Sequence, residues 1–459
     1  MTGIPLLIVF CLAIILMIVA ISKFHIHPFL SLMGTSLVLA VVVGLPLEKI
    51  PGIIGSGFSG VFSSIGIVII LGALIGLILE KTGAAIRLAD VVIRFVGEKH
   101  PQLALMLMGW IVSIPVFCDS GFVILNPIRK ALCRKLKGAS PAGMAVALSA
   151  GLYAAHVFIP PTPGPIAAAG SLGLADHLAG VILAGVIASV PALAAAYIFS
   201  LYIAKKDISV HADEKESTEK SYEELVAGFG KLPGAFSSFA PIVIPVILMA
   251  LGSFVSMIGL QGSSAVLCKF FATPIIALTV GLLLAVRLLV STHTMNRFAA
   301  ITDETLKTVG PILFVTAAGG VLGKVITAAG FVEFMKANAA FLSSVGIFFP
   351  FLISAILKTA QGSSTVAITT TAGIMGMYTD SASMMSALGL QSEMAALLTV
   401  MAIGAGAMTV SHANDSYFWV VTNFTGLDPQ DGYRTQSMMT LVVGIVSMVS
   451  IFLASLVLL

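Results

Sequence analysis

Long apolar runs alternate with short polar stretches along almost the whole chain of 459 residues. A helix needs about 20 mostly apolar residues to cross the hydrocarbon core of a bilayer, and many of the runs have that length. They lack the two-residue alternation of membrane barrel strands, so the pattern predicts helices. We expect about ten membrane-spanning helices, at residues 4–21, 28–43, 61–79, 144–159, 178–204, 239–258, 274–289, 312–329, 394–410 and 435–459.

Two further apolar stretches, residues 101–132 and 345–378, carry polar residues in their middle. Polar segments at membrane depth are tolerated only where a helix breaks and is buried in protein or lines a cavity. We therefore expect both stretches to form re-entrant helical hairpins, each entering and leaving the membrane on one side. Two of the spanning helices are also interrupted. The four breaks expected in the chain are residues 118–121, 160–165, 358–365 and 411–416.

The order of these elements repeats along the chain. We assign residues 1–204 to a first repeat, with a Gly- and Ser-rich link at 52–60, residues 205–237 to a hydrophilic cytoplasmic linker, and residues 238–459 to a second repeat. Basic residues cluster at 129–137, and cytoplasmic loops are rich in Lys and Arg. Counting spans from these positions places both chain termini in the periplasm and gives the two halves opposite orientations. Inverted repeats with broken helices are typical of secondary transporters.

Composition excludes a soluble protein. Hydrophobic residues make up 58% of the chain and charged residues 10%, with a mean hydropathy of +1.07, whereas a soluble domain carries about 25% charged residues. The 4 cysteines lack the spacing of a metal site or a disulfide framework, so we expect neither metal nor cofactor. The basic cluster suits contact with lipid headgroups, not nucleic acid. The first apolar run lacks signal-peptide features, so we expect a helix there.

Four motifs coincide with the four breaks. They are PVFCDSGFVILNP at residues 115–127, LYAAHVFIPPTPGP at 152–165, LKTAQGSSTVAITTTAG at 357–373 and TVSHANDSYFWVV at 409–421. Together they resemble the gluconate:proton symporter family of bacterial inner membranes, part of a wider ion transporter superfamily of inverted-repeat carriers. The resemblance covers essentially the whole chain and implies proton-driven uptake of gluconate, a related sugar acid or a small hydroxy acid. D-serine or another small organic acid stays open as the solute. The superfamily also favours a homodimer.

The tip of the second hairpin offers residue types that suit an acid. Gln361 and Gly362 lead into Ser363, Ser364 and Thr365. Free backbone N–H groups at the start of a half-helix attract anions, and side-chain hydroxyls can bond to those of a sugar acid. Serine and threonine can instead serve helix packing or bond to their own backbone. Their clustering at one expected break favours substrate binding.

The other breaks carry titratable groups. Asp119 is a carboxylate inside an apolar stretch, where an ionisable residue is a functional hypothesis by default. Lys358 can pair with a carboxylate of the protein or of the substrate, or extend outward to the interface. A structural hydrogen-bonding role is the alternative for each group. The expected substrate-binding set is Asp119, Ser120, Gly121, His156, Thr162, Gln361, Gly362, Ser363, Ser364, Thr365, His412 and Asn414, and the expected proton-coupling set is Asp119, Asp415, His412 and His156.

Two other functional classes compete with a carrier. The string Asp119-Ser120-Gly121 resembles the nucleophile region of some serine proteases, which suggests an intramembrane hydrolase acting through Ser120. Such an enzyme needs neither a duplicated architecture nor a second polar break. A channel should show rings of charge or a carbonyl filter, and neither is visible in the sequence. We therefore expect an all-α polytopic carrier of a small anion and protons, not an enzyme.

Overall fold

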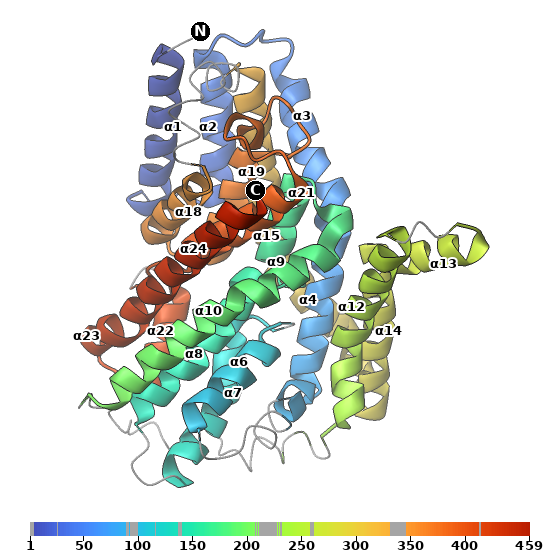
Figure 1. The fold of residues 1–459 in the computed structure, drawn as a ribbon, viewed down its shortest axis with the longest axis vertical. Coiled ribbons are helices and arrows are strands. Elements are labelled where there is room, and N and C mark those ends of the chain that lie inside the picture. The colour runs from blue at the N-terminus through green and yellow to red at the C-terminus, as the bar shows by residue number, and fades with distance from the viewer. Residues whose placement is uncertain are drawn as a thin grey trace.

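The structure is a computed structural model of the full chain. It describes residues 4–24, 26–88, 91, 100–114, 116–135, 140–206, 208, 210, 227, 229, 232–257, 261–330, 346–412 and 415–459. Within this part of the chain every regular element is a helix, which confirms the predicted all-α fold (Figure 1). Most of the expected linker and residue Asn414 lie outside the described residues.

The first half of the chain forms nine labelled helices within the described residues. They are α1 (Ile4–Ser22), α2 (Pro28–Val42), α3 (Ile50–Val61), α4 (Ile67–Lys81), α6 (Pro101–Val112), α7 (Cys118–Lys135), α8 (Pro141–Phe158), α9 (Pro163–Leu172) and α10 (Leu178–Ala204). A π-helical turn, η1 (Phe62–Gly66), joins α3 to α4, so these two helices form one continuous element.

The second half of the chain is also helical within the described residues. Its described helices are α12 (Ala235–Met257), α13 (Ser263–Ala272), α14 (Pro274–Ser291), α15 (Phe298–Ala328), α18 (Phe348–Gln361), α19 (Ser364–Met375), α20 (Met384–Ala387), α21 (Glu393–Met408), α22 (Ser416–Thr425), α23 (Pro429–Gly432) and α24 (Met438–Leu458). A second π-helical turn, η5 (Tyr433–Ser437), leads from α23 into α24.

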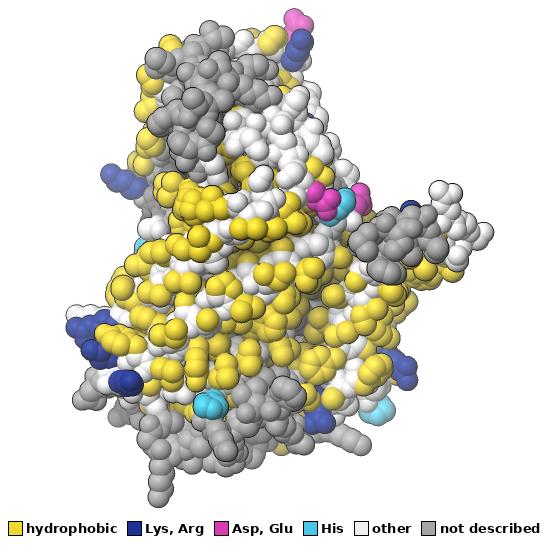
Figure 2. Space-filling view, in the orientation of Figure 1, with side chains coloured by type: hydrophobic (Ala, Val, Ile, Leu, Met, Phe, Trp, Pro, Cys, Tyr) yellow, Lys and Arg dark blue, Asp and Glu magenta, His cyan; other side chains and the backbone are white. Residues whose placement is uncertain are grey.

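Several helical segments are long and apolar enough to cross a membrane. Within the described residues there are 6 of them, Pro141–Leu172, Ala175–Ala204, Ala235–Gly252, Pro274–Ser291, Met295–Ala328 and Pro429–Leu458. Shorter apolar helices, among them α2, α6, α18, α19 and α21, accompany them. Figure 2 shows that hydrophobic side chains cover the middle of one face, while most charged side chains in view lie nearer its edges. The chain is a multi-pass membrane protein.

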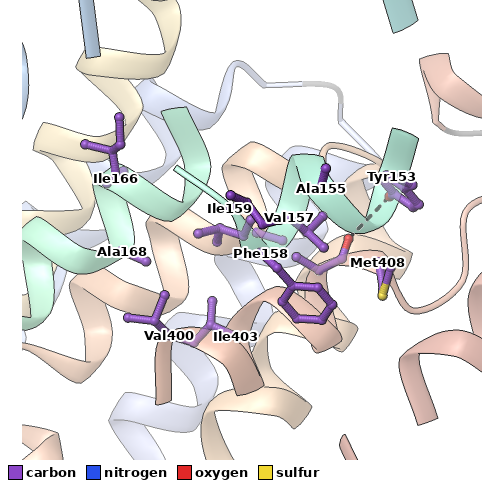
Figure 3. Close-up of a cluster of buried hydrophobic side chains, with 14 of the residues drawn as sticks. Tyr153, Ala155, Val157, Phe158, Ile159, Ile166, Ala168, Val400, Ile403 and Met408 are labelled. Carbon is purple, nitrogen blue, oxygen red and sulfur yellow. Dashed lines mark hydrogen bonds between the residues drawn. The ribbon is translucent and has the colours of Figure 1, made fainter. Parts of the chain in front are cut away.

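Helix α8 lies at the centre of the molecule. Every one of its residues after Pro141 is buried, as expected for a helix that is apolar on all sides. A Cβ atom on Gly151 would collide with the backbone of α6, so glycine allows the two helices to approach closely. On another side of α8, Val157 and Phe158 pack among side chains of α21 such as Ile403 (Figure 3).

The link expected at residues 52–60 is helical instead, because α3 begins at Ile50 and continues through this segment. One of its glycines, Gly57, serves close packing. A Cβ atom on Gly57 would lie 2.7 Å from the Cα atom of Val321, so α3 and α15 pack backbone against backbone. Small residues at such contacts are common between membrane helices, and they explain why a glycine-rich sequence does not form a loop here.

Helices α7 and α19 each pack against both halves of the chain. Helix α6 packs against α8, and α18 packs against α21, so α6 and α18 each contact a helix of their own half of the chain. Helix α19 packs against α15 of its own half and α9 of the other half, and α7 packs against α8 of its own half and α22 of the other half. This arrangement brings the starts of α7, α19 and α22, which lie far apart in the sequence, to one place beside α8.

Candidate functional site

A polar cavity of about 230 Å³ lies where these helices begin. Helices α7, α19 and α22 each point their N-terminal end at it, and α8 forms a further wall. Its lining residues are Cys118, Asp119, Tyr153, His156, Gly362, Ser363, Ser364, Thr365, Asp415, Ser416 and Tyr417. The volume is below the roughly 300–1,000 Å³ typical of pockets for drug-sized ligands, so the cavity suits a small solute.

The start of α19 is shaped by three consecutive residues. Gly362 ends α18 in a left-handed conformation with φ of 86°, which favours glycine. Ser363 then caps α19, because its hydroxyl accepts a hydrogen bond from the backbone N–H of Val366 at 3.3 Å. The first N–H groups of a helix have no acceptor within the helix. The N–H groups of Ser364 and Thr365 therefore give this wall of the cavity a positive partial charge.

Tyr153 holds Ser364 in place from the side of α8. The two hydroxyl oxygens are 2.5 Å apart, and the tyrosine hydroxyl also reaches the carbonyl oxygen of Ala407 at 3.4 Å. Figure 3 shows this buried tyrosine beside α21. Because a hydroxyl can donate and accept, the pair Tyr153–Ser364 can offer either function to a ligand.

The partner that the sequence left open for Lys358 is Asp415. The Lys358 Nζ atom lies 2.6 Å from Asp415 Oδ2, both side chains are buried, and the ammonium also donates to the carbonyl oxygen of Gly362. Asp415 Oδ2 accepts a second hydrogen bond from the Ser411 hydroxyl at 2.5 Å, and Oδ1 caps α22 by accepting from the N–H of Tyr417 at 3.1 Å. Both carboxylate oxygens are thus bonded, as a buried charge requires.

Asp119 is bonded much more weakly. It lies in the first turn of α7, where the Ser416 hydroxyl donates to Oδ1 at 3.3 Å and the Cys118 thiol lies 3.7 Å from Oδ2. No cationic group forms an ion pair with it within the described part of the chain. This carboxylate faces the cavity with acceptor capacity to spare.

His156 presents an unused ring nitrogen. Its imidazole is buried at the cavity wall, with the rings of Phe117 and Tyr153 at centroid distances of 6.1 and 6.5 Å. Its Nδ1 atom has no hydrogen-bond partner among the described residues. A buried polar atom without a partner is uncommon, and one at a cavity wall is available to a ligand.

Other expected site residues lie away from the cavity lining. Gly121 packs against the Leu152 side chain, and the Thr162 hydroxyl donates to the carbonyl oxygen of Ile159 at 2.6 Å. His412 Nε2 lies 2.9 Å from the carbonyl oxygen of Thr359 and so joins the break after α21 to the end of α18. The side chains of Ser120 and Gln361, and the whole of Asn414, fall outside the described part of the structure.

Four cavity residues were not expected from the sequence. Three of them could have been predicted because they lie close to Asp119 or Asp415 in the sequence: Cys118, Ser416 and Tyr417. Tyr153 lies one helical turn before His156, so the two share a face of α8. That spacing is the signal that could have identified it.

A further layer of hydrogen bonds fixes the break between α21 and α22. The N–H of Ser411 donates to the Thr440 hydroxyl at 2.9 Å, and the Ser437 hydroxyl donates to the carbonyl oxygen of Ser411 at 2.5 Å. Ser437 belongs to η5, and Thr440 to α24. These contacts hold Ser411 where its own hydroxyl reaches Asp415.

A multi-pass helical fold with a polar cavity at the ends of broken helices is typical of a membrane transport protein. The chain belongs to the GntP permease family, whose model matches residues 4–457. The resemblance identified from the four motifs is thereby confirmed. The protein is a permease and not an enzyme, so the hydrolase interpretation of Ser120 is set aside.

Its relatives match over nearly their full length. The chain is 33% identical over 459 residues to the inner membrane permease YgbN of Escherichia coli, covering 97% of both chains. It is 30% identical over 453 residues to a gluconate permease of Pseudomonas aeruginosa, covering 97% of this chain and 96% of the relative.

Two solved structures share the fold. The YdaH transporter of Alcanivorax borkumensis superposes with a TM-score of 0.62 at 16% identity, covering 94% of this chain and 97% of that one. MtrF of Neisseria gonorrhoeae superposes with a TM-score of 0.60 at 14% identity, covering 94% and 96%. These similarities establish the fold alone.

Proposed function

We propose that this permease imports gluconate or a related sugar acid together with protons. The observation that carries the proposal is the cavity at the start of α19, where helix N–H groups and several hydroxyls converge in a small volume. Relatives named gluconate permeases match the chain over nearly its whole length, which supports the same class of solute.

The cavity offers different groups to the two parts of such a solute. The carboxylate fits at the start of α19, because the N–H groups of Ser364 and Thr365 attract an anion. The hydroxyls of a sugar acid then face Tyr153, His156 and Ser416, which line the remaining walls. Each hydrogen bond of this kind contributes about 0.5–1.5 kcal/mol to affinity, and more if one partner is charged.

Coupling to protons follows from the electrical cost of importing an anion. Moving one negative charge into a cell with an inside-negative potential costs about 2.3 kcal/mol per 100 mV. A proton that travels with the solute cancels that charge. The titratable groups proposed to carry it are Asp119, Asp415, His156 and His412.

We also propose a membrane arrangement. Residues 1–204 and 238–459 form two inverted repeats with about ten spanning helices and two re-entrant hairpins, α6–α7 and α18–α19. The similar element order and the contacts that α7 and α19 make with the opposite half support this arrangement. The protein lies in a bacterial inner membrane as a homodimer, with both termini in the periplasm and the linker in the cytoplasm.

Cysteine accessibility tests this topology. In a background without native cysteines, Thr2→Cys should react with an impermeant reagent from the periplasm. Lys215→Cys and Gln430→Cys should react only after the membrane is opened. Labelling of Lys215→Cys in intact cells contradicts the inverted arrangement.

Transport in proteoliposomes tests the solute. The purified protein should accumulate labelled gluconate when the pH outside is lowered, and unlabelled solutes should compete according to their fit. Competition should be tested with other aldonates, small hydroxy acids and D-serine. Strong competition by D-serine with none by gluconate overturns the proposed substrate and assigns the protein to the alternative solute.

A further inference from the structure

We infer that Asp119 acts as a charge gate: an anionic substrate enters the cavity only after this carboxylate takes up a proton, while Asp415 stays in its ion pair with Lys358. The inference rests on the proposed function, since it assumes a substrate that carries a carboxylate. It assigns distinct tasks to two acids that the sequence treats alike.

The two carboxylates differ in their hydrogen bonds. Asp415 accepts from Lys358, from the Ser411 hydroxyl and from the N–H of Tyr417. Hydrogen bonds to the ionised form of a carboxylate favour that form, and a cation at 2.6 Å favours it further. Among the described residues, the Asp119 carboxylate is contacted by one side-chain hydroxyl at 3.3 Å and one thiol at 3.7 Å. Of the two acids, Asp119 is therefore the one that can accept a proton without breaking an ion pair.

The Asp119 carboxylate and the carboxylate of a bound substrate would lie close together. Asp119 and the start of α19 line the same cavity of about 230 Å³. An ionised Asp119 and a bound carboxylate would therefore be like charges within one small, largely buried space. Like charges that share a site disfavour each other, and a proton on one of them removes the repulsion. Substrate and proton thus bind together, which is the requirement for symport.

Other titratable groups also surround Asp119. The titratable groups that face it from its own helix, from α8, from the start of α22 and from α18 are Cys118, Tyr153, His156, Asp415, Tyr417 and Lys358. The ammonium of Lys358 is engaged by Asp415 and the Gly362 carbonyl. Asp415 adds a second negative charge near the cavity. His156 is the other group at the wall that could take the proton, so the experiment must separate the two.

The first measurement is substrate affinity against pH for the full-length protein in detergent, with gluconate as the probe. When one proton must bind before the ligand, the apparent Kd rises tenfold per pH unit once the carboxylate is ionised. We expect this rise in the wild type and in His156→Gln. Asp119→Asn should show a flat profile at the affinity of the wild type in acid. A wild-type slope in Asp119→Asn, or a flat profile in His156→Gln alone, overturns the inference.

The second measurement needs no substrate. Infrared difference spectra of the substrate-free protein on acidification should show a carboxylic-acid C=O band that disappears in Asp119→Asn. The matched control is Asp176→Asn, which removes an exposed acid before α10 and should leave the band unchanged. If the band is unaffected in Asp119→Asn, the gate is disproved. If the band depends on Asp119 but gluconate binds at no pH, the proposed substrate fails instead.

Discussion

The starts of α7 and α22 each place an aspartate at the same cavity, and the two are bonded in opposite ways. Asp415 is saturated by a lysine, a serine hydroxyl and a backbone N–H. Asp119 has one long hydrogen bond from the Ser416 hydroxyl and a distant thiol. The difference teaches that a buried acid in a carrier is not by itself a proton site. What matters is whether its charged form already has partners.

The start of α19 lies at the same cavity as the starts of α7 and α22. Unlike α7 and α22, it has no acidic residue in its first turn or at its cap. The positive ends of α7 and α22 are compensated by Asp119 and Asp415, whereas that of α19 is not. An anionic solute therefore has one preferred position in the cavity, beside Ser364 and Thr365.

The largest effect is expected at Asp119. Asp119→Asn should reduce pH-driven accumulation in proteoliposomes to the level of passive equilibration, because the variant cannot carry a proton. Counterflow of labelled for unlabelled solute should persist, since asparagine keeps the shape and part of the hydrogen bonding. Asp176→Asn should accumulate solute like the wild type. Wild-type accumulation by Asp119→Asn would show that Asp119 does not carry the proton.

A large effect on stability is expected at Asp415. Asp415→Asn leaves the Lys358 ammonium buried without its carboxylate, which should lower the free energy of unfolding by about 3–5 kcal/mol. The measurement is thermal unfolding in detergent. The double variant Lys358→Met with Asp415→Leu should recover most of the loss, because no buried charge remains.

The matched control for this pair is Asp431→Asn. It removes the partner of the exposed Arg434, at 3.3 Å, and should cost only about 0–1 kcal/mol. If Asp415→Asn is as mild as this control, the buried pair contributes little to the free energy of unfolding. The contrast with Asp119 would then lose its basis.

A smaller effect is expected at the start of α19. Ser364→Ala and Thr365→Val should each raise the Kd for substrate by about 2- to 12-fold, as loss of one hydrogen bond implies. Thr279→Val is a suitable control, since this exposed hydroxyl bonds only to the carbonyl oxygen of Ile275 in its own helix. Unchanged affinity in both site variants would show that the solute binds elsewhere.

A related effect on folding is expected at Ser363. Ser363→Ala removes the cap of α19 and should cost about 0.5–2 kcal/mol of stability. Thermal unfolding measures it. A loss of affinity in Ser363→Ala that exceeds the loss in Ser364→Ala would show that the Ser363 hydroxyl serves the substrate more than the helix.

Much of the fold could be predicted because a bilayer strongly restricts which segments can cross it. Apolar runs identify helices, and polar clusters such as Gly362–Thr365 reveal where a helix must break. Contacts between distant segments could not be predicted in the same way. The partner of Lys358 is 57 residues further along the chain, and only the packing of α18 and α21 brings the two together.

Residues with two plausible roles were also missed. Tyr153 lies in an apolar helix, where a tyrosine is ordinarily a packing residue. Its spacing from His156 puts it on the face of the cavity but does not predict its contact with Ser364. The glycine-rich segment at 52–60 has the composition of a loop, yet it is helical and its Gly57 allows α3 to lie directly against α15. In both cases the neighbouring helix decides the role of the residue.

The joint between the end of α18 and the break after α21 has a mechanical consequence. Lys358 reaches Asp415, and His412 reaches the carbonyl oxygen of Thr359, so two separate contacts connect the same pair of segments. One contact alone would act as a pivot, but two resist both rotation and sliding. The tip formed by α18 and α19 therefore moves together with the start of α22 as one rigid body. A motion that separates α22 from α7 must break both the weak contact between Ser416 and Asp119 and the hydrogen bond from the Asn126 amide to the carbonyl oxygen of Phe424 at 2.9 Å.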